Sequence, residues 1–339
     1  MTKTIWTFAI LLLTSFLLTV NAPNISKILS QNKSTSPPIS ETINMGYSNW
    51  SGWWLWEIAK SENLFEKNGV EVNLKWFDNY SESITALATG QLDANSQTLN
   101  DTIPQADKAI YGEVVVLVND NSAGNDKIIV SQDINKIEDL KGKKVALEEG
   151  VVDDFLLTLA LEKHGMSRDD VEIINIETGA AASAFALGKV DAVGAFPPFW
   201  LTALEREGSR ELISSKDFPG AIPDLLVVTQ KLIDENPKAV QGLVNTWFDI
   251  LDFMKQNPER ASQIIARRAG VSLEELKLFS SGVKIFDRAD NIQAFKRGNN
   301  MKHLNFAAEK ISEFLMSKLK VMDKKPDIKN LLEAKFVNS

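Results

Sequence analysis

The sequence has 339 residues, no cysteine, two histidines and a formal net charge of −8. This length is sufficient for two compact domains, and the acidic balance without any Lys- or Arg-rich run argues against nucleic-acid binding. The absence of cysteine excludes a disulfide, a thiolate nucleophile and a lipid-modified N-terminal cysteine.

Residues 1–22 have the pattern of a secretory signal peptide. Lys3 precedes an apolar run from Ile5 to Val20, and small residues follow around Ala22. The run is short for a membrane span, and the Ser- and Pro-rich residues 23–41 are typical of a linker rather than of a stop-transfer segment. An uncleaved anchor is the alternative interpretation. Cleavage predicts a soluble periplasmic protein that is not a lipoprotein.

From residue 43 onward, short apolar runs alternate with helical patterns. The first series predicts strands over 43–47, 70–77, 92–97 and 113–118, and helices over 53–67, 81–89 and 102–110. The second series predicts strands over 127–131, 143–147, 171–176 and 190–195, and helices over 153–163 and 180–187. After a strand over 224–229 the pattern becomes helical. First-turn prolines mark two helices there, a third opens at Ser272, and an amphipathic helix over 301–319 precedes a partly ordered tail over 324–339.

The two series contain a short internal sequence repeat, which we call the echo. Residues 86–94 read ALATGQLDA and residues 184–192 read AFALGKVDA, and each combines a helix end, a glycine and a strand start. Two similar lobes explain this repetition, although a common connector used twice is the alternative. We therefore predict an α/β protein in which each lobe is a mostly parallel sheet flanked by helices. Lobe one would comprise 42–122 and 225–339, and lobe two 123–224, which makes a two-strand hinge near 118–127 and 221–226.

Four motifs in order make the pattern more specific. They are WLWEIAKSENLFEKNGV (54–70), the first echo, IEDLKGKKVA (137–146) followed by Gly150, and the second echo. Across 43–237 the chain resembles solute-binding proteins of ABC importers in the nitrate/taurine/aliphatic-sulfonate group, which share a fold with thiamine-pyrimidine synthases. The resemblance implies a type II periplasmic-binding fold, a ligand held between two lobes, and delivery to a membrane permease driven by a separate ATPase.

A tryptophan-rich stretch is the leading candidate for the ligand site. Four of the eight tryptophans fall within residues 48–56. Trp50 and Trp53 could form the walls of a small-ligand pocket, since Ser51 and Gly52 between them allow close approach. Alternatively, all four tryptophans simply pack in the core.

The ligand crevice of an open parallel sheet lies outside the carboxyl ends of its strands. This rule and the two predicted crossovers select these candidate ligand-binding residues: Trp50, Ser51, Trp53, Asp78, Thr98, Asp101, Asp120, Asp153, Phe196 and Asp224. The set contains five acids and no Lys or Arg, so an anion would find only helix N-terminal amides there. Acids beside tryptophan faces favour a cationic or zwitterionic amine or amidine.

Two alternatives to this ligand assignment remain open. Asp101 and Asp153 could cap helices, and the other acids could be solvated loop residues. Nitrate, taurine or an aliphatic sulfonate is then the expected ligand.

Catalysis has little support in the sequence. His164 precedes Gly165 at a predicted helix end, which suits a C-terminal capping residue, and His303 falls in a predicted helix without acidic or serine partners. No metal-ligand cluster, phosphate-binding glycine loop or nucleophile elbow is visible, and the cysteine-rich motif of the pyrimidine synthases has no counterpart. A glycosidase-like carboxylate pair stays open.

We therefore expect a monomeric binding protein without cofactor or metal, whose partners are a small solute and a permease with its ATPase. A ligand-sensing module for a membrane receptor is the alternative class. Ligand identity, affinity and the permease-contact surface are not predicted.

Overall fold

The computed structural model describes residues 42–338, which lie within one compact unit, 40–339. The predicted signal peptide and the whole of the predicted linker lie outside the described residues. Two β-sheets with flanking helices make up the fold, as the sequence predicted for an α/β protein.

The first sheet has six strands. They are β1 (Ile43–Tyr47), β2 (Val72–Trp76), β3 (Ala94–Thr98), β4 (Glu113–Ser122), β10 (Pro223–Thr229) and β11 (Val283–Ile285). In the order β11-β4-β10-β3-β1-β2, β1 runs parallel to β2 and β3, while β10 runs antiparallel to β3 and β4. Every residue of β4 and of β10 is buried, which explains the apolar runs at 114–118 and 225–228 within them.

The second sheet has five strands. They are β5 (Lys127–Val130), β6 (Lys144–Leu147), β7 (Glu172–Asn175), β8 (Ala192–Ala195) and β9 (Arg210–Ser214), in the order β7-β6-β8-β5-β9. β6 runs parallel to β7 and β8, whereas β5 runs antiparallel to β8 and β9. The sheets are therefore mixed rather than mostly parallel, because the strand that follows each crossover, β5 or β10, runs antiparallel to both of its neighbours.

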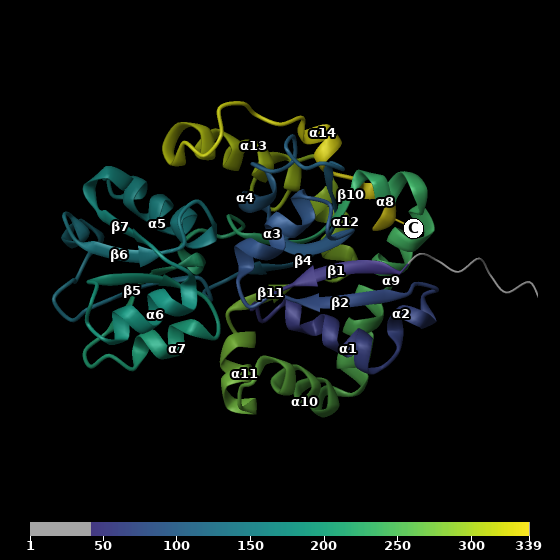
Figure 1. Cartoon of the computed structure of the whole chain (residues 1–339), viewed down its shortest axis with the longest axis horizontal. Helices are drawn as coiled ribbons and strands as arrows, with labels where there is room; N and C mark the ends of the chain where they lie inside the picture. Colours follow the sequence, from purple (N-terminus) through teal and green to yellow (C-terminus); the bar gives the residue numbers. More distant parts are fainter. Residues whose placement is uncertain (1–41, 339) are drawn as a thin grey trace, which may run out of the picture. The chain divides into compact units, whose positions relative to one another are not determined.

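The helices flank these sheets. They are α1 (Trp56–Ser61), α2 (Leu64–Lys67), α3 (Tyr80–Ala88), α4 (Leu99–Thr102), α5 (Val152–Lys163), α6 (Thr178–Ala186), α7 (Phe199–Leu204), α8 (Gln230–Glu235), α9 (Pro237–Gln256), α10 (Pro258–Ala269), α11 (Leu273–Ser280), α12 (Arg288–Phe295), α13 (Leu304–Phe314) and α14 (Ile328–Leu331). On the first sheet, α1 and α2 lie opposite α3 and α4; on the second, α5 lies opposite α6 and α7 (Figure 1).

The internal echo corresponds to a repeated topology. The strand orders β3-β1-β2 and β8-β6-β7 are equivalent, with α3 leading into β3 and α6 leading into β8. Gly90 (φ 73°) and Gly188 (φ 69°) follow these two helices in the left-handed conformation, which glycine adopts without a Cβ penalty. The prediction of two similar units is confirmed for this pair of three-stranded segments.

Several predicted helices are wrong in detail. The expected helix over 53–67 is divided into a 3-10 turn (Trp53–Leu55), α1 and α2, with Asn63 in the left-handed conformation at the second break. The expected helix over 102–110 is a series of hydrogen-bonded turns after α4, since Pro104 has no N–H to continue the helical ladder. α13 begins only after His303, and its last turn widens into a π-helix (Leu315–Leu319).

The chain passes between the sheets twice, through residues 123–126 and 215–222, which we call the crossover segments. The second crossover lies slightly earlier in the chain than predicted, because β10 begins at Pro223. The Ser122 and Ser215 hydroxyl oxygens lie 2.6 Å apart, and the Gly124 N–H donates to Ser215 Oγ at 2.7 Å. Direct hydrogen bonds therefore hold the two crossover segments side by side.

Candidate functional site

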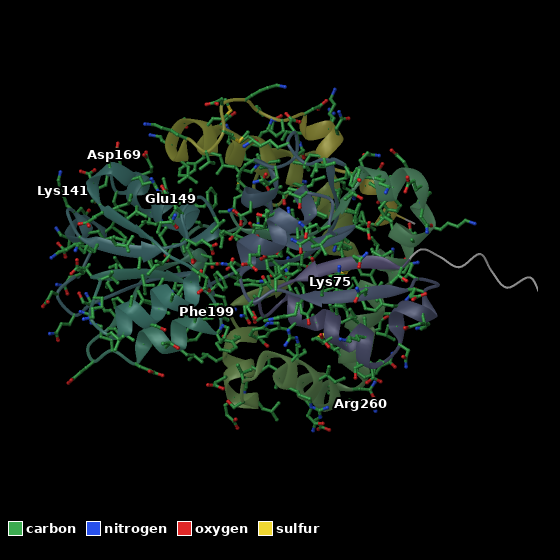
Figure 2. The ribbon with its side chains drawn as sticks, in the orientation of Figure 1. Lys75, Lys141, Glu149, Asp169, Phe199 and Arg260 are labelled. Carbon is green, nitrogen blue, oxygen red and sulfur yellow. The ribbon has the colours of Figure 1, made fainter. Side chains whose placement is uncertain are left out.

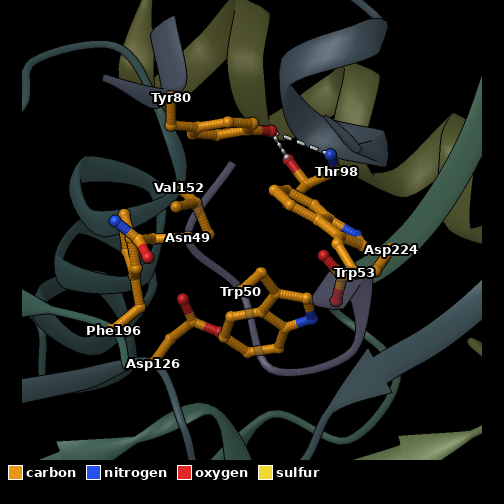
Figure 3. Close-up of a pocket in the computed structure, with 9 residues that line it drawn as sticks. All are labelled: Asn49, Trp50, Trp53, Tyr80, Thr98, Asp126, Val152, Phe196 and Asp224. Carbon is orange, nitrogen blue, oxygen red and sulfur yellow. Dashed lines mark hydrogen bonds between the residues drawn. The ribbon is translucent and has the colours of Figure 1, made fainter. Parts of the chain in front are cut away.

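A small pocket forms where loops from both sheets meet. Nine residues line it: Asn49, Trp50, Trp53, Tyr80, Thr98, Asp126, Val152, Phe196 and Asp224 (Figure 3). The pocket contains about 230 Å³ of empty space, but only about 10 Å³ is open to the centre of a water-sized molecule. That is close to the minimum needed for one water, so a larger ligand requires the walls to move apart.

Strand register brings three of the predicted site residues into one row. Thr98 on β3 lies opposite Asp224 on β10, and Asp224 lies opposite Asp120 on β4. Residues directly opposite in antiparallel strands point to the same face, so their side chains gather at one sheet edge. The Asp120 and Asp224 carboxyl groups lie close enough to interact electrostatically. Because β10 runs antiparallel, its first residues lie at the same edge as the last residues of β3 and β4.

The Trp50–Trp53 loop covers this acid row. The Trp50 indole N–H donates to Asp120 Oδ1 at 2.9 Å, and the Trp50 and Trp53 rings lie 6.3 Å apart. Gly52 has an ordinary φ of −76°, but a Cβ at this position would lie 2.0 Å from Asp120 Oδ2. The glycine is needed for the close approach of the Asp120 carboxyl group rather than for its backbone angle.

The other two tryptophans of the cluster pack in the core. Trp54 makes an edge contact with Phe279 at 6.0 Å, and Trp56 lies 5.2 Å from Trp247. The Trp56 indole N–H donates to Ser96 Oγ at 3.0 Å. The packing interpretation thus holds for Trp54 and Trp56, whereas Trp50 and Trp53 line the pocket and their contact with a ligand stays a prediction.

The second sheet contributes the opposite wall. Asp126 immediately precedes β5, Phe196 immediately follows β8, and the pairing of Lys127 with Ala195 places these two residues side by side. Val152 begins α5, and the next residue, Asp153, is fully buried and accepts a hydrogen bond from Thr178 Oγ1 at 3.3 Å.

A tyrosine and a third aspartate complete the first-sheet side. The Thr98 N–H donates to the Tyr80 hydroxyl at 2.9 Å (Figure 3), and Thr98 Oγ1 donates to Asp101 Oδ2 at 2.7 Å. Asp101 lies in the first turn of α4, whose N-cap is Thr98, and Asp153 lies in the first turn of α5, whose N-cap is Val151. Neither aspartate is the N-cap residue, so that alternative is wrong.

Five carboxyl groups of this region are almost completely buried, with exposed fractions between 0 and 4%: Asp101, Asp120, Asp126, Asp153 and Asp224. Burial, which disfavours the charged form, raises the pKa of Asp101 and of Asp120 to about 7, and that of Asp126 to about 6. Burial also raises the pKa of Asp153 and of Asp224 well above the ordinary value. The negative charge of Asp126 raises the Asp153 pKa further, and that of Asp120 does the same for Asp224.

Positive charge is lacking at this site. None of the nine lining residues is Lys or Arg. Lys127 follows Asp126 in sequence, but its ammonium group pairs with Glu211. Other charged side chains, such as Lys141 and Arg260, project from the surface (Figure 2). Within residues 42–338, no group of three or more His, Cys, Asp or Glu side chains has a metal-binding arrangement.

The structure brings most of the predicted site residues together. Trp50, Trp53, Thr98, Phe196 and Asp224 line the pocket. The remaining buried members lie behind its walls: Ser51, Asp101, Asp120 and Asp153. Ser51 accepts a hydrogen bond from Asn125 Nδ2 at 3.1 Å. Their roles in ligand binding stay predictions.

Asp78 lies apart from this group. It is exposed and accepts a hydrogen bond from the Trp76 indole at 2.7 Å, at the end of edge strand β2. The sequence list omitted Asp126, which precedes a strand rather than following one, and also Asn49, Tyr80 and Val152.

Neither histidine belongs to the site. His164 is the C-cap residue of α5, as predicted. His303 is the N-cap residue of α13 rather than a residue inside the helix, and its Nδ1 lies 2.9 Å from the Lys296 carbonyl oxygen.

Comparison with known proteins identifies the family. The family model described as NMT1/THI5 like matches residues 57–261, which is more than half of the chain. A protein of Brucella abortus, named only as a binding protein, is 30% identical over 263 residues, which cover 76% of this chain and 81% of the relative. The taurine-binding periplasmic protein of Escherichia coli is 26% identical over 225 residues, which cover 63% and 69% of the two chains.

Solved structures agree on the fold. The crystal structure of the periplasmic aliphatic sulphonate binding protein from Escherichia coli superposes with a TM-score of 0.69 at 22% identity, covering 86% of this chain and 92% of that one. A desulfurization enzyme has a TM-score of 0.61 at 14% identity, so the same fold also occurs in an enzyme.

No helix within residues 42–338 combines the length and apolar character needed to cross a membrane. Three findings support the same family as the motifs at 54–70, 86–94, 137–146 and 184–192. They are the family match, the identity to the Brucella relative and the fold shared with the solved structures. The chain belongs to the NMT1/THI5-like family, and among its relatives are the periplasmic binding proteins for taurine and aliphatic sulfonates.

Proposed function

We propose that this protein is the periplasmic solute-binding component of an ABC importer, and that its solute is a small organic cation or zwitterion with an amine or amidine group. It captures the solute between lobe one (42–122 and 225–339) and lobe two (123–224) and delivers it, as a monomer, to a permease with its ATPase. The family and the binding proteins among its relatives support the importer assignment.

The buried acid cluster is the observation that carries the choice of ligand. Oδ2 of Asp120, of Asp126 and of Asp224, and Oδ1 of Asp153, are buried without a hydrogen-bond partner among the described residues. Buried polar atoms without partners are costly, and of these four residues Asp126 and Asp224 line the pocket. A ligand with several N–H donors and a positive charge would satisfy the unpartnered oxygens of these two. The indole faces of Trp50 and Trp53 add favourable cation–π positions.

Ligand binding would also change the protonation of the cluster. With the pocket empty, the raised pKa values keep some of these carboxyl groups neutral near pH 6–7. A cation that enters the pocket favours their charged forms, lowers their pKa values and releases protons. Cation affinity should therefore increase as the pH rises through this range.

Closure of the lobes follows from the division of the pocket between the two sheets. A solute that contacts Trp50 and Asp224 on one side and Asp126 and Phe196 on the other gains all of these contacts only when the lobes are together. The small volume of the pocket supports entry by opening at the crossover segments.

A taurine or sulfonate ligand is a second candidate, because the names of two groups of relatives favour it. A sulfonate would depend on backbone N–H groups, such as those at the start of α5, and on carboxyl groups that keep their protons. Taurine contains both an ammonium and a sulfonate group, so its ammonium group could occupy the acid cluster. Anion affinity should decrease as the pH rises.

Isothermal titration calorimetry at pH 6 and pH 8 tests these alternatives. The probes are guanidinium, short alkylamines, taurine, an aliphatic sulfonate and nitrate, measured in two buffers with different ionisation enthalpies. We expect a cation to bind with net proton release and more tightly at pH 8. Binding of sulfonate or nitrate alone, more tightly at pH 6, would contradict the cationic assignment.

A matched pair of variants locates the binding site. Asp224→Asn should weaken a bound cation by about 10- to 100-fold, since it removes a buried charged partner. Asp78→Asn makes the same chemical change at an exposed aspartate outside the pocket and should leave the affinity unchanged. Equal affinities for both variants would exclude Asp224 from the site.

Two further measurements separate the functional classes. Recovery of the bound solute without chemical change supports a binding protein, whereas turnover would indicate an enzyme. Permease and ATPase genes next to the gene for this protein would support import, while a receptor gene in their place would support a ligand-sensing module.

A further inference from the structure

A second cavity adjoins the crossover segments and shares no lining residue with the first pocket. One wall of the cavity contains Ser122 and Ala123 at the first crossover and Ser215 at the second. Another side is closed by Gly220 and Met301. A Cβ on Gly220 would lie 2.9 Å from Met301 Cβ, so the second crossover already packs tightly on the start of α13. The cavity therefore touches both connections between the sheets.

The cavity is large enough for a small organic molecule, and apolar side chains form much of its lining. Its volume is about 760 Å³, within the range of roughly 300–1,000 Å³ that is typical of small-molecule sites. Val118 on β4, Pro223 on β10, Phe286 after β11, and Ala294 and Leu304 from α12 and α13 contribute to the lining. Such a surface suits an apolar ligand body.

Three lysines among the lining residues give the cavity its charge. Lys216 pairs with Glu211 at 2.6 Å, and Lys284 pairs with Asp290 at 3.0 Å. Lys302 is exposed, and within residues 42–338 it has no ion-pair partner. The cavity thus combines an apolar lining with one uncompensated ammonium group at its edge, which favours an anionic head group on an apolar ligand.

We propose that this cavity binds an amphipathic carboxylate, with the carboxylate at Lys302 and the apolar chain between β4, β10 and α12. The bound molecule contacts both crossover segments, so it has different contacts when the sheets rotate relative to each other. It therefore shifts the equilibrium between open and closed forms. This site goes beyond the proposed function and does not depend on which solute the first pocket takes.

Decanoate is a suitable probe, and isothermal titration calorimetry is the direct test. We expect Lys302→Glu to weaken decanoate binding by about tenfold, because it replaces attraction at the head group by repulsion. Lys189→Glu makes the same charge change at an exposed lysine in the turn between α6 and β8, and should have less than about a twofold effect. No binding to the parent protein, or equal loss in both variants, would overturn the proposal.

A cavity-filling variant tests the location independently of charge. Ala123 is exposed and lines the cavity, so Ala123→Trp fills part of the cavity without altering a buried position. We expect it to abolish decanoate binding while its circular dichroism melting curve stays cooperative. Asp224→Asn should retain decanoate binding, which separates this site from the first pocket. Unchanged binding by Ala123→Trp, or its loss in Asp224→Asn, would place decanoate elsewhere.

Discussion

The buried Asp126 makes a defined prediction about how stability depends on pH. Burial raises its pKa from 3.8 to about 6, and its Oδ2 has no hydrogen-bond partner among the described residues. Between these two pKa values the folded protein binds more protons than the unfolded chain. The free energy of unfolding therefore decreases as the pH rises from about 4 to about 6, and then levels off. Asp126→Asn should remove this loss.

The expected size follows from the pKa shift. A difference of about two pKa units corresponds to roughly 3 kcal/mol in total, at about 1.4 kcal/mol per unit. About 1.4 kcal/mol of this falls between pH 5 and pH 8, because at pH 5 the unfolded aspartate is already almost fully ionised. At roughly 2 °C per kcal/mol for a chain of this size, the melting temperature of the parent should fall by about 3 °C more than that of the variant.

Urea and thermal unfolding of the ligand-free protein at pH 5 and pH 8, followed by tryptophan fluorescence, measure this difference. Asp133→Asn is the matched control, because Asp133 is exposed and lies outside the pocket. The control should show the same pH dependence as the parent. If Asp126→Asn also showed the parental pH dependence, the burial of an ionisable Asp126 would be refuted.

Three further predictions concern packing and the crossovers. Gly52→Ala should lower the free energy of unfolding by about 1–3 kcal/mol, since its Cβ would overlap the Asp120 carboxyl group; an unchanged denaturation midpoint would contradict that close approach. Phe279→Ala should lower the free energy of unfolding by about 3–5 kcal/mol, because it removes a buried ring in edge contact with Trp200 at 5.2 Å. A decrease below about 1 kcal/mol in the same assay would argue against this packing. Ser215→Ala should cost about 1–3 kcal/mol and speed hydrogen exchange at the crossover segments, and equal exchange rates would show that its hydroxyl does not hold them together.

The sequence predicted the central strands well because burial determines their composition. The apolar run at 113–118 and the glycines after α3 and α6 indicate strand and helix boundaries directly. The edge strands β9 and β11 were missed because they are only partly buried and lack a clear apolar pattern. Local patterns therefore identify strands with a clear apolar pattern, including the edge strands β2 and β7, better than strands without one.

The site was predicted in part, and its gaps come from strand direction. The rule that ligands lie beyond the ends of parallel strands selected Trp50 and Thr98, and both line the pocket. It omitted Asp126, because the antiparallel β5 brings its first residues to the edge where β8 ends. It included Asp78, which follows a strand at the margin of the sheet. The burial of the acids depends on long-range packing and has no local signature.

The position of the acid row has a mechanical consequence. Asp120 and Asp224 lie on the two strands that lead into and out of the crossover segments, close to the axis about which the proposed closure turns. In a rotation of about 30°, a group about 4 Å from the axis moves about 2 Å, whereas one 20 Å away moves about 10 Å. The Trp50–Asp120–Asp224 unit would thus stay assembled in the open form. A solute would dock first near the pivot, and a pair of fluorescent labels would report closure best when attached far from it.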